Sequence, residues 1–283
     1  VGDMMAFIQY AMQIIMSFLM ICMISVMLPR AAVSAERVDE VLKSETKIHD
    51  PKEPKTLPKN GKGEVAFEHV SFHYPGAEED VLHDISFTAE PGKTTAFIGS
   101  TGCGKSTLVN LIPRFYDVTD GKITIDGKDV RDVSQHELRE KLGYVPQKAV
   151  LFSGDIASNI LYGNPDGSEA EMIEAATIAQ ATEFIDQKKK KYKSPISQGG
   201  ANVSGGQKQR LSIARAIAKH PDVYIFDDSF SALDYKTDAT LRAELKEKTA
   251  ESTVMIVAQR ISTILHADQI IVLEDGQIVG KGT

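Results

Sequence analysis

Eight residues from Gly99 to Ser106 have the types and spacing of a loop that binds phosphate groups. They read Gly99-Ser-Thr-Gly-Cys-Gly-Lys105-Ser106. Glycines at the first, fourth and sixth positions let successive backbone N–H groups turn toward an anion without steric strain. Lys105 is placed to reach the β- and γ-phosphates of a nucleotide, and the Ser106 hydroxyl suits a Mg²⁺ ligand. The segment therefore predicts a site for ATP and Mg²⁺.

The elements that must position this loop are visible on both sides of it. Residues Thr94–Ile98 have the apolar run of a short buried strand, and Ser106–Ile112 that of a helix start. A strand, a loop and a helix in this order bring phosphates to the positive end of the helix. The alternative, a plain glycine-rich turn, leaves both flanking elements unexplained.

A second strand is expected to bring carboxylates to the same place. Residues Val223–Phe226 are apolar and are followed by Asp227 and Asp228. A strand that ends in acids beside a phosphate loop suits Mg²⁺ binding, for which we select Asp227. Solvated acids in a turn are the alternative.

The segment Ser204-Gly-Gly-Gln207, with the basic Lys208 and Arg210 after it, resembles the signature of ABC transporter nucleotide-binding domains, of the exporter type. The resemblance covers essentially the whole chain. Residues 1–45 resemble the last membrane helix with its cytoplasmic extension, 46–63 a linker, and 64–283 the nucleotide-binding cassette. The fold this implies is an α/β P-loop NTPase of ABC type. It has a mainly parallel sheet core, an antiparallel β lobe and a helical subdomain, preceded by one transmembrane helix.

The resemblance assigns roles to residues at positions that match the family pattern. Tyr74 corresponds to the aromatic that stacks on adenine, and Gln147 to the glutamine that meets Mg²⁺ and senses the membrane domain. The loop of Ser231 to Asp234 corresponds to one that crosses a dimer interface. ATP is expected to lie against Gly99, Ser100, Thr101, Gly102, Cys103, Gly104, Lys105, Ser106 and Thr107, with Mg²⁺ on Ser106, Gln147 and Asp227.

The signature residues Ser204, Gly205, Gly206 and Gln207 are expected to act on a different nucleotide. A hydroxyl and two glycine N–H groups at the start of a helix form an anion site. The resemblance implies that this site closes over the γ-phosphate of ATP held by a partner cassette, in a head-to-tail dimer.

Two positions depart from the family pattern. Asp228 stands where a catalytic glutamate is usual, which withdraws the carboxylate by on the order of 1 Å, and such a misplacement costs about 100-fold in rate. Gln259 stands where a histidine is usual, and an amide cannot take up a proton to become a cation. With Lys105 these residues form the expected catalytic set, and both changes weaken hydrolysis while leaving the binding residues in place.

Composition limits the class of protein and its partners. A net charge of −7 argues against nucleic acid as a partner, because such binding needs a basic surface. The two cysteines, Cys22 and Cys103, form no disulfide framework, which favours a reducing compartment for the folded part.

The N-terminal segment predicts a membrane span. Residues Met4–Leu28 carry no charge, and as a helix they cover about 37 Å, enough for a hydrocarbon core of about 30 Å. Arg30, Arg37 and Lys43 follow the segment and favour a cytoplasmic exit. A buried helix of a soluble protein is the alternative. Because the chain begins with Val1 and holds one span, we expect it to be a piece of a longer protein.

The pattern of apolar and polar residues in other segments also favours a nucleotide-binding cassette. Alternating segments at Glu64–Tyr74 and Val81–Ala89 predict an antiparallel lobe, and helical patterns cover Glu169–Ala181 and Gln207–Ala218. The proline- and lysine-rich residues 46–63 predict a linker. Further strands are expected at Ile123–Ile125, Val254–Val257 and Ile270–Leu273.

These inferences predict a subunit of an ATP-driven exporter of small, drug-like, amphipathic molecules. Its partner is expected to be a second half-transporter chain, in a heterodimer whose competent site this signature completes. Expected localisation is the plasma or inner membrane, multi-pass at full length, with the cassette in the cytoplasm. A homodimer with slow but working sites, a purely regulatory subunit and a soluble cassette ATPase of the DNA-repair or chromosome-organising kind are the alternatives.

Overall fold

Helix α1 (Gly2–Leu42) makes up most of the first of two structural units, Val1–His49. The computed structural model describes all 283 residues except the side chain of Ser262. Helix α1 is long and apolar enough, by length and composition, to cross a membrane. It continues through Pro29 to Leu42, past the charged residues Glu36, Arg37, Asp39 and Glu40. No residue of the described helix is buried within the chain.

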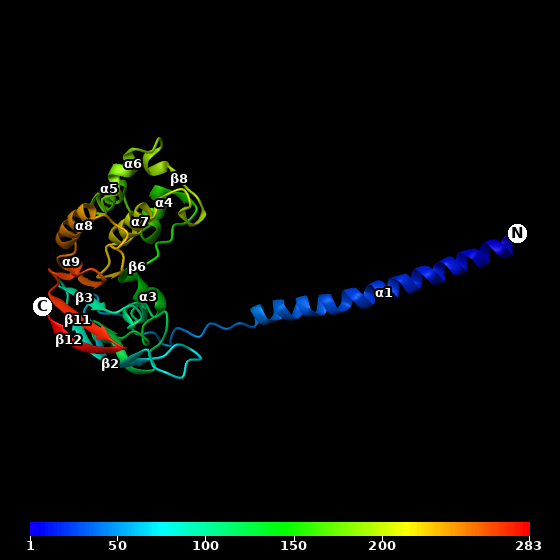
Figure 1. Cartoon of the computed structure of the whole chain (residues 1–283), viewed down its shortest axis with the longest axis horizontal. Coiled ribbons are helices and arrows are strands. Elements are labelled where there is room, and N and C mark those ends of the chain that lie inside the picture. The colour runs from blue at the N-terminus through cyan, green and yellow to red at the C-terminus, as the bar shows by residue number, and fades with distance from the viewer. The chain divides into compact units, whose positions relative to one another are not determined.

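A six-stranded sheet forms the centre of the second unit, Asp50–Thr283 (Figure 1). Its pairings are parallel except that of the last two strands, which confirms the mostly parallel core. In spatial order the strands are β12 (Gln277–Gly282), β11 (Gln269–Glu274), β3 (Thr94–Gly99), β10 (Thr253–Val257), β9 (Val223–Asp227) and β6 (Leu142–Val145).

Alternation along the central strands divides the apolar core in two. On β9, Tyr224 and Phe226 belong to one buried cluster, and Val223 and Ile225 to the other. Because successive side chains of a strand point to opposite faces, a sheet covered on both sides requires this continuous apolar sequence. Strand β9 is buried along its whole length, so its terminal Asp227 is held in a rigid, apolar frame.

The antiparallel lobe predicted from Glu64–Tyr74 and Val81–Ala89 is confirmed, but the strand predicted at Ile123–Ile125 belongs to this lobe and not to the parallel sheet. Its sheet has the order β2 (Leu82–Ala89), β1 (Val65–Phe72), β4 (Asp120–Ile125) and β5 (Lys128–Asp129), and every pairing is antiparallel. Phe67 and Phe87 stack between β1 and β2 with ring centroids 4.6 Å apart. Such a cross-strand aromatic pair fixes the register of two half-buried strands.

Helices gather away from the sheets in a subdomain that carries the signature helix (Figure 1). It consists of α4 (Ile156–Ile160), α5 (Glu169–Ile178), α6 (Thr182–Asp186) and α7 (Gly205–Ala218), with the strand pair β7 (Gly154–Asp155) and β8 (Pro195–Ile196) and short 3₁₀ turns at Leu161–Gly163, Lys191–Lys193 and Gln198–Gly200. The helix predicted over Glu169–Ala181 is interrupted after α5, because Gln180 has a left-handed φ of 55°. The remaining helices are α2 (Lys105–Leu111), α3 (Gln135–Glu140), α8 (Tyr235–Lys248) and α9 (Ile261–Ile264).

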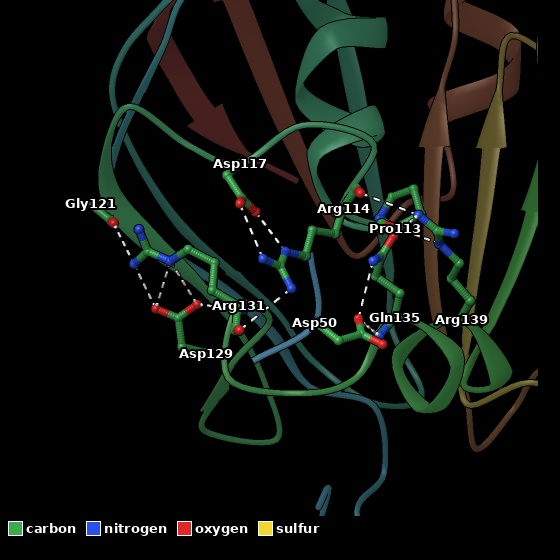
Figure 2. A network of polar contacts seen from close by, with 9 residues as sticks. All are labelled: Asp50, Pro113, Arg114, Asp117, Gly121, Asp129, Arg131, Gln135 and Arg139. Atoms are coloured by element: carbon green, nitrogen blue, oxygen red, sulfur yellow. Dashed lines mark hydrogen bonds and ion pairs between the residues drawn. The ribbon is translucent and has the colours of Figure 1, made fainter. Parts of the chain in front are cut away.

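Part of the expected linker packs on the folded unit, which begins at Asp50. Asp50 Oδ1 accepts hydrogen bonds from the backbone N–H and the amide of Gln135 at 2.9 and 3.1 Å, beside the Arg139 contacts to Pro113 and Arg114 (Figure 2). These bonds pull the pKa of the Asp50 carboxyl below its usual value. Farther along the linker, Leu57 is buried and its N–H donates to Glu137. Composition marks this segment as irregular, but its anchoring depends on hydrogen-bond partners that are 63 or more residues away in the sequence.

Candidate nucleotide-binding site

The glycine-rich loop between β3 and α2 has the backbone that its sequence predicts. Gly102 and Gly104 have φ values of 90° and 97°, in the left-handed region. A Cβ on Gly104 would lie 2.8 Å from Leu82 Cδ2, whereas one on Gly102 would meet nothing within 4 Å. A Cβ on Gly99 would meet the Leu273 carbonyl and the Cys103 sulfur. Glycine is therefore required at both ends of the loop by packing as well as by backbone angle.

Lys105 is enclosed by the loop that it is predicted to serve. Its ammonium donates to the carbonyls of Gly99 at 2.9 Å and Ser100 at 2.6 Å, and its side chain is buried. Cys103 Sγ lies 3.4 Å from the same nitrogen. These contacts hold a full positive charge at the centre of the loop, where it can meet phosphate oxygens.

The predicted metal ligands Ser106 and Asp227 are neighbours. Ser106 Oγ donates to Asp227 Oδ1 at 2.8 Å, although the two residues are 121 positions apart. Burial raises the pKa of the Asp227 carboxyl and the charge of Asp228 adds to this, while the Ser106 hydrogen bond and Lys105 act in the opposite direction. A hydroxyl and a carboxylate oxygen at this distance fit the oxygen ligands that Mg²⁺ prefers.

Asp228 is held by two amide groups. Its Oδ2 accepts a hydrogen bond from Gln259 Nε2 at 2.9 Å and a second from Gln147 Nε2 at 3.2 Å. The residue is 8% exposed and its φ is 47°. The structure thus brings together Asp228, Gln259 and Gln147, which are expected at the catalytic-base, switch and Mg²⁺-binding positions, through contacts that span 31 and 81 residues.

Tyr74 lies beside the start of α2. Its hydroxyl shares a hydrogen bond with Thr107 Oγ1 at 2.9 Å, and its ring makes edge contacts with Phe72 and Tyr116. The half-buried ring is fixed by these contacts next to the phosphate loop. This is a suitable position for an aromatic that stacks on a base. Sequence reasoning did not find Tyr116, whose contact with Tyr74 arises only in the fold.

The signature residues occupy the N-terminus of the fourteen-residue helix α7. Ser204 Oγ accepts from the N–H of Gln207 at 3.3 Å, and Gln207 Oε1 accepts from the N–H of Ser204 at 3.1 Å, which completes a capping box. Ser204 and Gly205 are exposed, and a Cβ on Gly205 would meet nothing within 4 Å. An open helix start with small residues can receive an anion from another molecule.

The loop from Ser231 to Asp234 adjoins both the signature and Asp228. A Cβ on Gly206 would lie 3.2 Å from the Ala232 carbonyl, so the loop passes close to the signature. The Asp228 carbonyl accepts from Ser231 Oγ at 2.9 Å. Asp234 caps α8 by accepting from the N–H of Thr237 at 3.0 Å, and these cap bonds lower its pKa.

Arg260 is a residue of this site that the sequence reasoning missed. Its guanidinium donates to the carbonyls of Ser231 at 3.0 Å and Leu233 at 3.4 Å. Arg260 therefore links the segment that carries Gln259 to the loop of Ser231–Asp234 by hydrogen bonds. Its position directly after Gln259 in the sequence points to it, but the hydrogen-bond acceptors of Arg260 are backbone carbonyls, which no sequence motif specifies.

The donor set as a whole fits ATP with Mg²⁺. Two glycines stand where a side chain would fill the loop, a buried ammonium lies at its centre, and a hydroxyl–carboxylate pair adjoins it. The described residues contain no cluster of three His, Cys, Asp or Glu side chains of the kind that holds a metal without a phosphate ligand. Mg²⁺ bound here would draw its other ligands from the nucleotide and water, as is usual for this ion.

Comparisons with known proteins agree with this geometry. Residues 82–231 match the family model described as ABC transporter. An uncharacterized ABC transporter ATP-binding protein of Mycobacterium tuberculosis is 48% identical over 286 residues, covering 100% of this chain and 49% of the relative. A putative multidrug export ATP-binding/permease protein of Staphylococcus aureus is 45% identical over 221 residues, covering 78% of this chain and 38% of the relative.

Among solved structures, a bacterial Atm1-family ABC exporter with ATP bound is similar at a TM-score of 0.84 and 34% identity, over 90% of this chain and 44% of that one. The chain thus spans about half the length, or less, of the proteins it matches.

Proposed function

The chain belongs to the ABC transporter family, and from this premise we propose that it is the subunit of a heterodimeric exporter whose own ATP site hydrolyses poorly. ABC exporters function as dimers, and an ABC ATP-binding domain implies ATPase activity. The Atm1-family structure and the multidrug-export relative support export as the direction of transport. The proposed cargo is a small, amphipathic, drug-like molecule.

The observation that carries the proposal is the state of Asp228. Its carboxylate is shorter than the glutamate usual in the family, and one of its oxygens already accepts from both Gln259 and Gln147. Two donated hydrogen bonds occupy this oxygen, so it is not free to accept a hydrogen bond from the attacking water, as a general base must. Gln259 cannot supply a positive charge in place of histidine. Binding is preserved while proton transfer is weakened.

In the proposed site each residue has a defined task. The loop Gly99–Thr107 positions the phosphates, Lys105 neutralises their charge and Tyr74 stacks on adenine. Ser106, Asp227 and Gln147 hold Mg²⁺, which when bound neutralises charge on the β- and γ-phosphates. Asp228 orients water without efficient proton removal, which leaves ATP bound for long periods.

The signature serves the partner's nucleotide. The exposed capping box of Ser204 and Gln207 and the open Gly205 give an intact anion site, in contrast to the altered Asp228 and Gln259. A chain that has an intact signature and a weakened catalytic pair is expected to lend its signature to the nucleotide of a second cassette. Closure around two nucleotides would shift the membrane helices between two arrangements.

Location follows from the same proposal. Helix α1 is proposed as one of several membrane helices of the full-length protein in the plasma or inner membrane, with the cassette in the cytoplasm. Lipid, the cargo and a second half-transporter chain are the proposed partners, and nucleic acid is not among them.

The full-length protein purified alone and together with its partner cassette tests the proposal. Alone it should bind ATP but turn it over slowly, and the complex should hydrolyse ATP rapidly. Brisk turnover by the protein alone would favour a homodimer with working sites. Unchanged turnover of the complex after Ser204→Ala would favour a purely regulatory subunit.

A further inference from the structure

The first residues of the folded unit, 50–57, contact helix α3 and the turn before it, and we call this segment the strap. Asp50 Oδ1 accepts hydrogen bonds from the backbone N–H and the side-chain amide of Gln135 at 2.9 and 3.1 Å. Lys55 meets Asp132 twice, because its ammonium donates to the carboxylate and its backbone N–H donates to the carbonyl, each at 2.7 Å. The strap is therefore held at both ends of its first six residues.

The strap is held more weakly at its start than at its end. Asp50 and Lys55 are exposed, and exposed contacts of charged groups contribute little to stability. Leu57 is 6% exposed, belongs to the same apolar cluster as Leu138 of α3, and donates its N–H to Glu137 at 2.8 Å. A load applied at the start of the strap would release Asp50 and Lys55 while Leu57 stays in place. The strap can thus have two states, docked and released.

A short connection joins the strap to helix α1. That helix ends at Leu42, and the described residues 43–49 form neither helix nor strand. A chain extends by at most about 3.5 Å per residue, so Leu42 and Asp50 can be no more than about 28 Å apart. A displacement of α1 beyond this reach requires the start of the strap to leave α3.

A line of hydrogen bonds continues from the strap toward the phosphate-binding helix α2 (Figure 2). Gln135, which is bound to Asp50, accepts through its Oε1 from Arg139 Nη2 at 3.0 Å. Arg139 also donates to the carbonyls of Pro113 at 3.1 Å and Arg114 at 3.3 Å. Because these two carbonyls lie directly after the C-cap of α2, the network ends on the C-terminal end of that helix.

Helix α2 connects this network to the nucleotide site. It has seven residues and spans about 10 Å, so a shift at its C-terminal end reaches Lys105 and Ser106 at its start. Ser106 donates to Asp227, the proposed Mg²⁺ ligand. Hydrogen-bond networks and rigid helices of this kind carry coupling between separate sites. Docking of the strap therefore favours one position of the residues that bind phosphate.

We propose that Asp50 is a positioning residue of the nucleotide site, and that the strap couples this site to the position of α1. Docking of the strap and binding of ATP favour each other, and a movement of α1 that releases the strap weakens ATP binding. Because linked equilibria are reciprocal, ATP in turn holds the strap docked and limits the positions open to α1. The inference rests on the proposed export function and adds a link between a membrane helix and the ATP site of the same chain.

Hydrogen–deuterium exchange in the full-length complex measures docking of the strap directly. Exchange at the N–H groups of Gln135, Lys55 and Leu57 is compared without nucleotide and with ATP and Mg²⁺. The Gln135 and Lys55 groups should exchange several times more slowly with ATP, whereas Leu57, which stays in place, should change little. In Asp50→Ala the Gln135 group should exchange equally fast under both conditions.

Three variants separate positioning from stability and from charge. Asp50→Ala removes the acceptor and should raise about three- to fivefold the concentration of azido-ATP that half-saturates labelling of this chain on ice. Asp50→Asn keeps an oxygen acceptor and should retain most of the affinity. Glu53→Ala removes an equally exposed charge from the strap and should leave the affinity unchanged. Thermal unfolding should be nearly the same in all three, because both residues are exposed.

A longer connection tests the link to α1. Six Gly/Ser residues inserted after Ser44 extend its reach by about 20 Å. They should lower ATP-driven extrusion of Nile red, a neutral amphipathic dye used as the cargo probe, several-fold with ATP affinity unchanged. Replacing Ser44–Lys47 by Gly-Ser-Gly-Ser, at equal length, should have no such effect.

The outcomes distinguish the strap from the export function. Exchange that ATP does not slow, or equal ATP affinity in Asp50→Ala and the unsubstituted chain, would overturn the role of Asp50. Extrusion that the insertion leaves unchanged would overturn the link to α1. Failure of the export function itself would instead appear as absent extrusion by the unsubstituted complex, and the exchange and affinity measurements would still decide whether the strap acts on the nucleotide site.

Discussion

Replacing Asp228 by glutamate and Gln259 by histidine should restore hydrolysis at this chain's own site. The Asp228 carboxylate accepts from two amides at 2.9 and 3.2 Å, and glutamate would extend it by on the order of 1 Å beyond that position. A catalytic group misplaced by this amount lowers the rate about 100-fold, so the rate of hydrolysis should rise by at most about 100-fold when the group is moved back. After Asp228→Glu alone, Gln259 still stands in place of histidine and cannot supply a positive charge, so the gain should be incomplete.

The expected order of rates follows from these two effects. Asp228→Glu alone should recover roughly 10-fold, Gln259→His alone little, and the double variant up to about 100-fold. Phosphate release is measured in a complex whose partner has its catalytic glutamate replaced by glutamine, so that only this site contributes. Thermal unfolding is the control, because a φ of 47° at residue 228 suits aspartate better than glutamate.

The reasoning is refuted if the double variant is no faster than the unsubstituted chain while it remains folded and binds ATP. A full gain from Gln259→His alone would also contradict it, because the shortened carboxylate would then be harmless.

Three further predictions concern the loop, the signature and the metal ligand. Gly104→Ala should abolish ATP binding, because its Cβ would lie 2.8 Å from a leucine methyl, whereas Gly127→Ala, equally left-handed but open, should leave binding by isothermal titration unchanged. Ser204→Ala and Ser168→Ala each remove the serine of a capping box, so each should lower the free energy of unfolding by about 1 kcal/mol. Only Ser204→Ala should also lower ATP turnover of the complex, by tenfold or more. Equal losses of turnover in the two variants would show that Ser204 acts only as a helix cap. Asp227→Asn should raise the unfolding temperature of the nucleotide-free protein by about 1–3 °C at neutral pH and remove its stabilisation by ATP with Mg²⁺, as calorimetry would measure. Burial raises the pKa of Asp227 in the folded state, so stability declines as pH rises from about 4, the unfolded value, through the raised folded value; an unchanged pH profile in the asparagine variant would contradict this.

The sequence predicts those parts of the fold in which pattern and length agree. Strand β3, the glycine loop and α2 follow from an apolar run, a spaced motif and a second apolar run. Strands β1 and β2 follow from an alternation of apolar and polar residues that is interrupted at His69 and Asp84, where the backbone is left-handed. Strand β6 was not found, because four residues are too short for a period to be evident. Helix α8 was missed because only Asp238, Leu241 and Leu245 are buried on it, which leaves a largely polar sequence.

The same distinction holds for the site. Lys105, Ser106 and Asp227 are set by motifs, and the structure places Ser106 and Asp227 2.8 Å apart. The shared hold of Gln147 and Gln259 on one oxygen of Asp228 depends on loops from different strands, so no local pattern contains it. Arg260 binds backbone carbonyls, and any sequence could supply those.

Nucleotide captured during turnover tests the central claim most directly. The complex is incubated with azido-ATP labelled on its α-phosphate and with Mg²⁺, cross-linked by light during steady turnover, and separated into its two chains. The chain described here should carry intact ATP, while the partner carries mainly ADP. ADP on this chain, formed as fast as on the partner, would contradict the account.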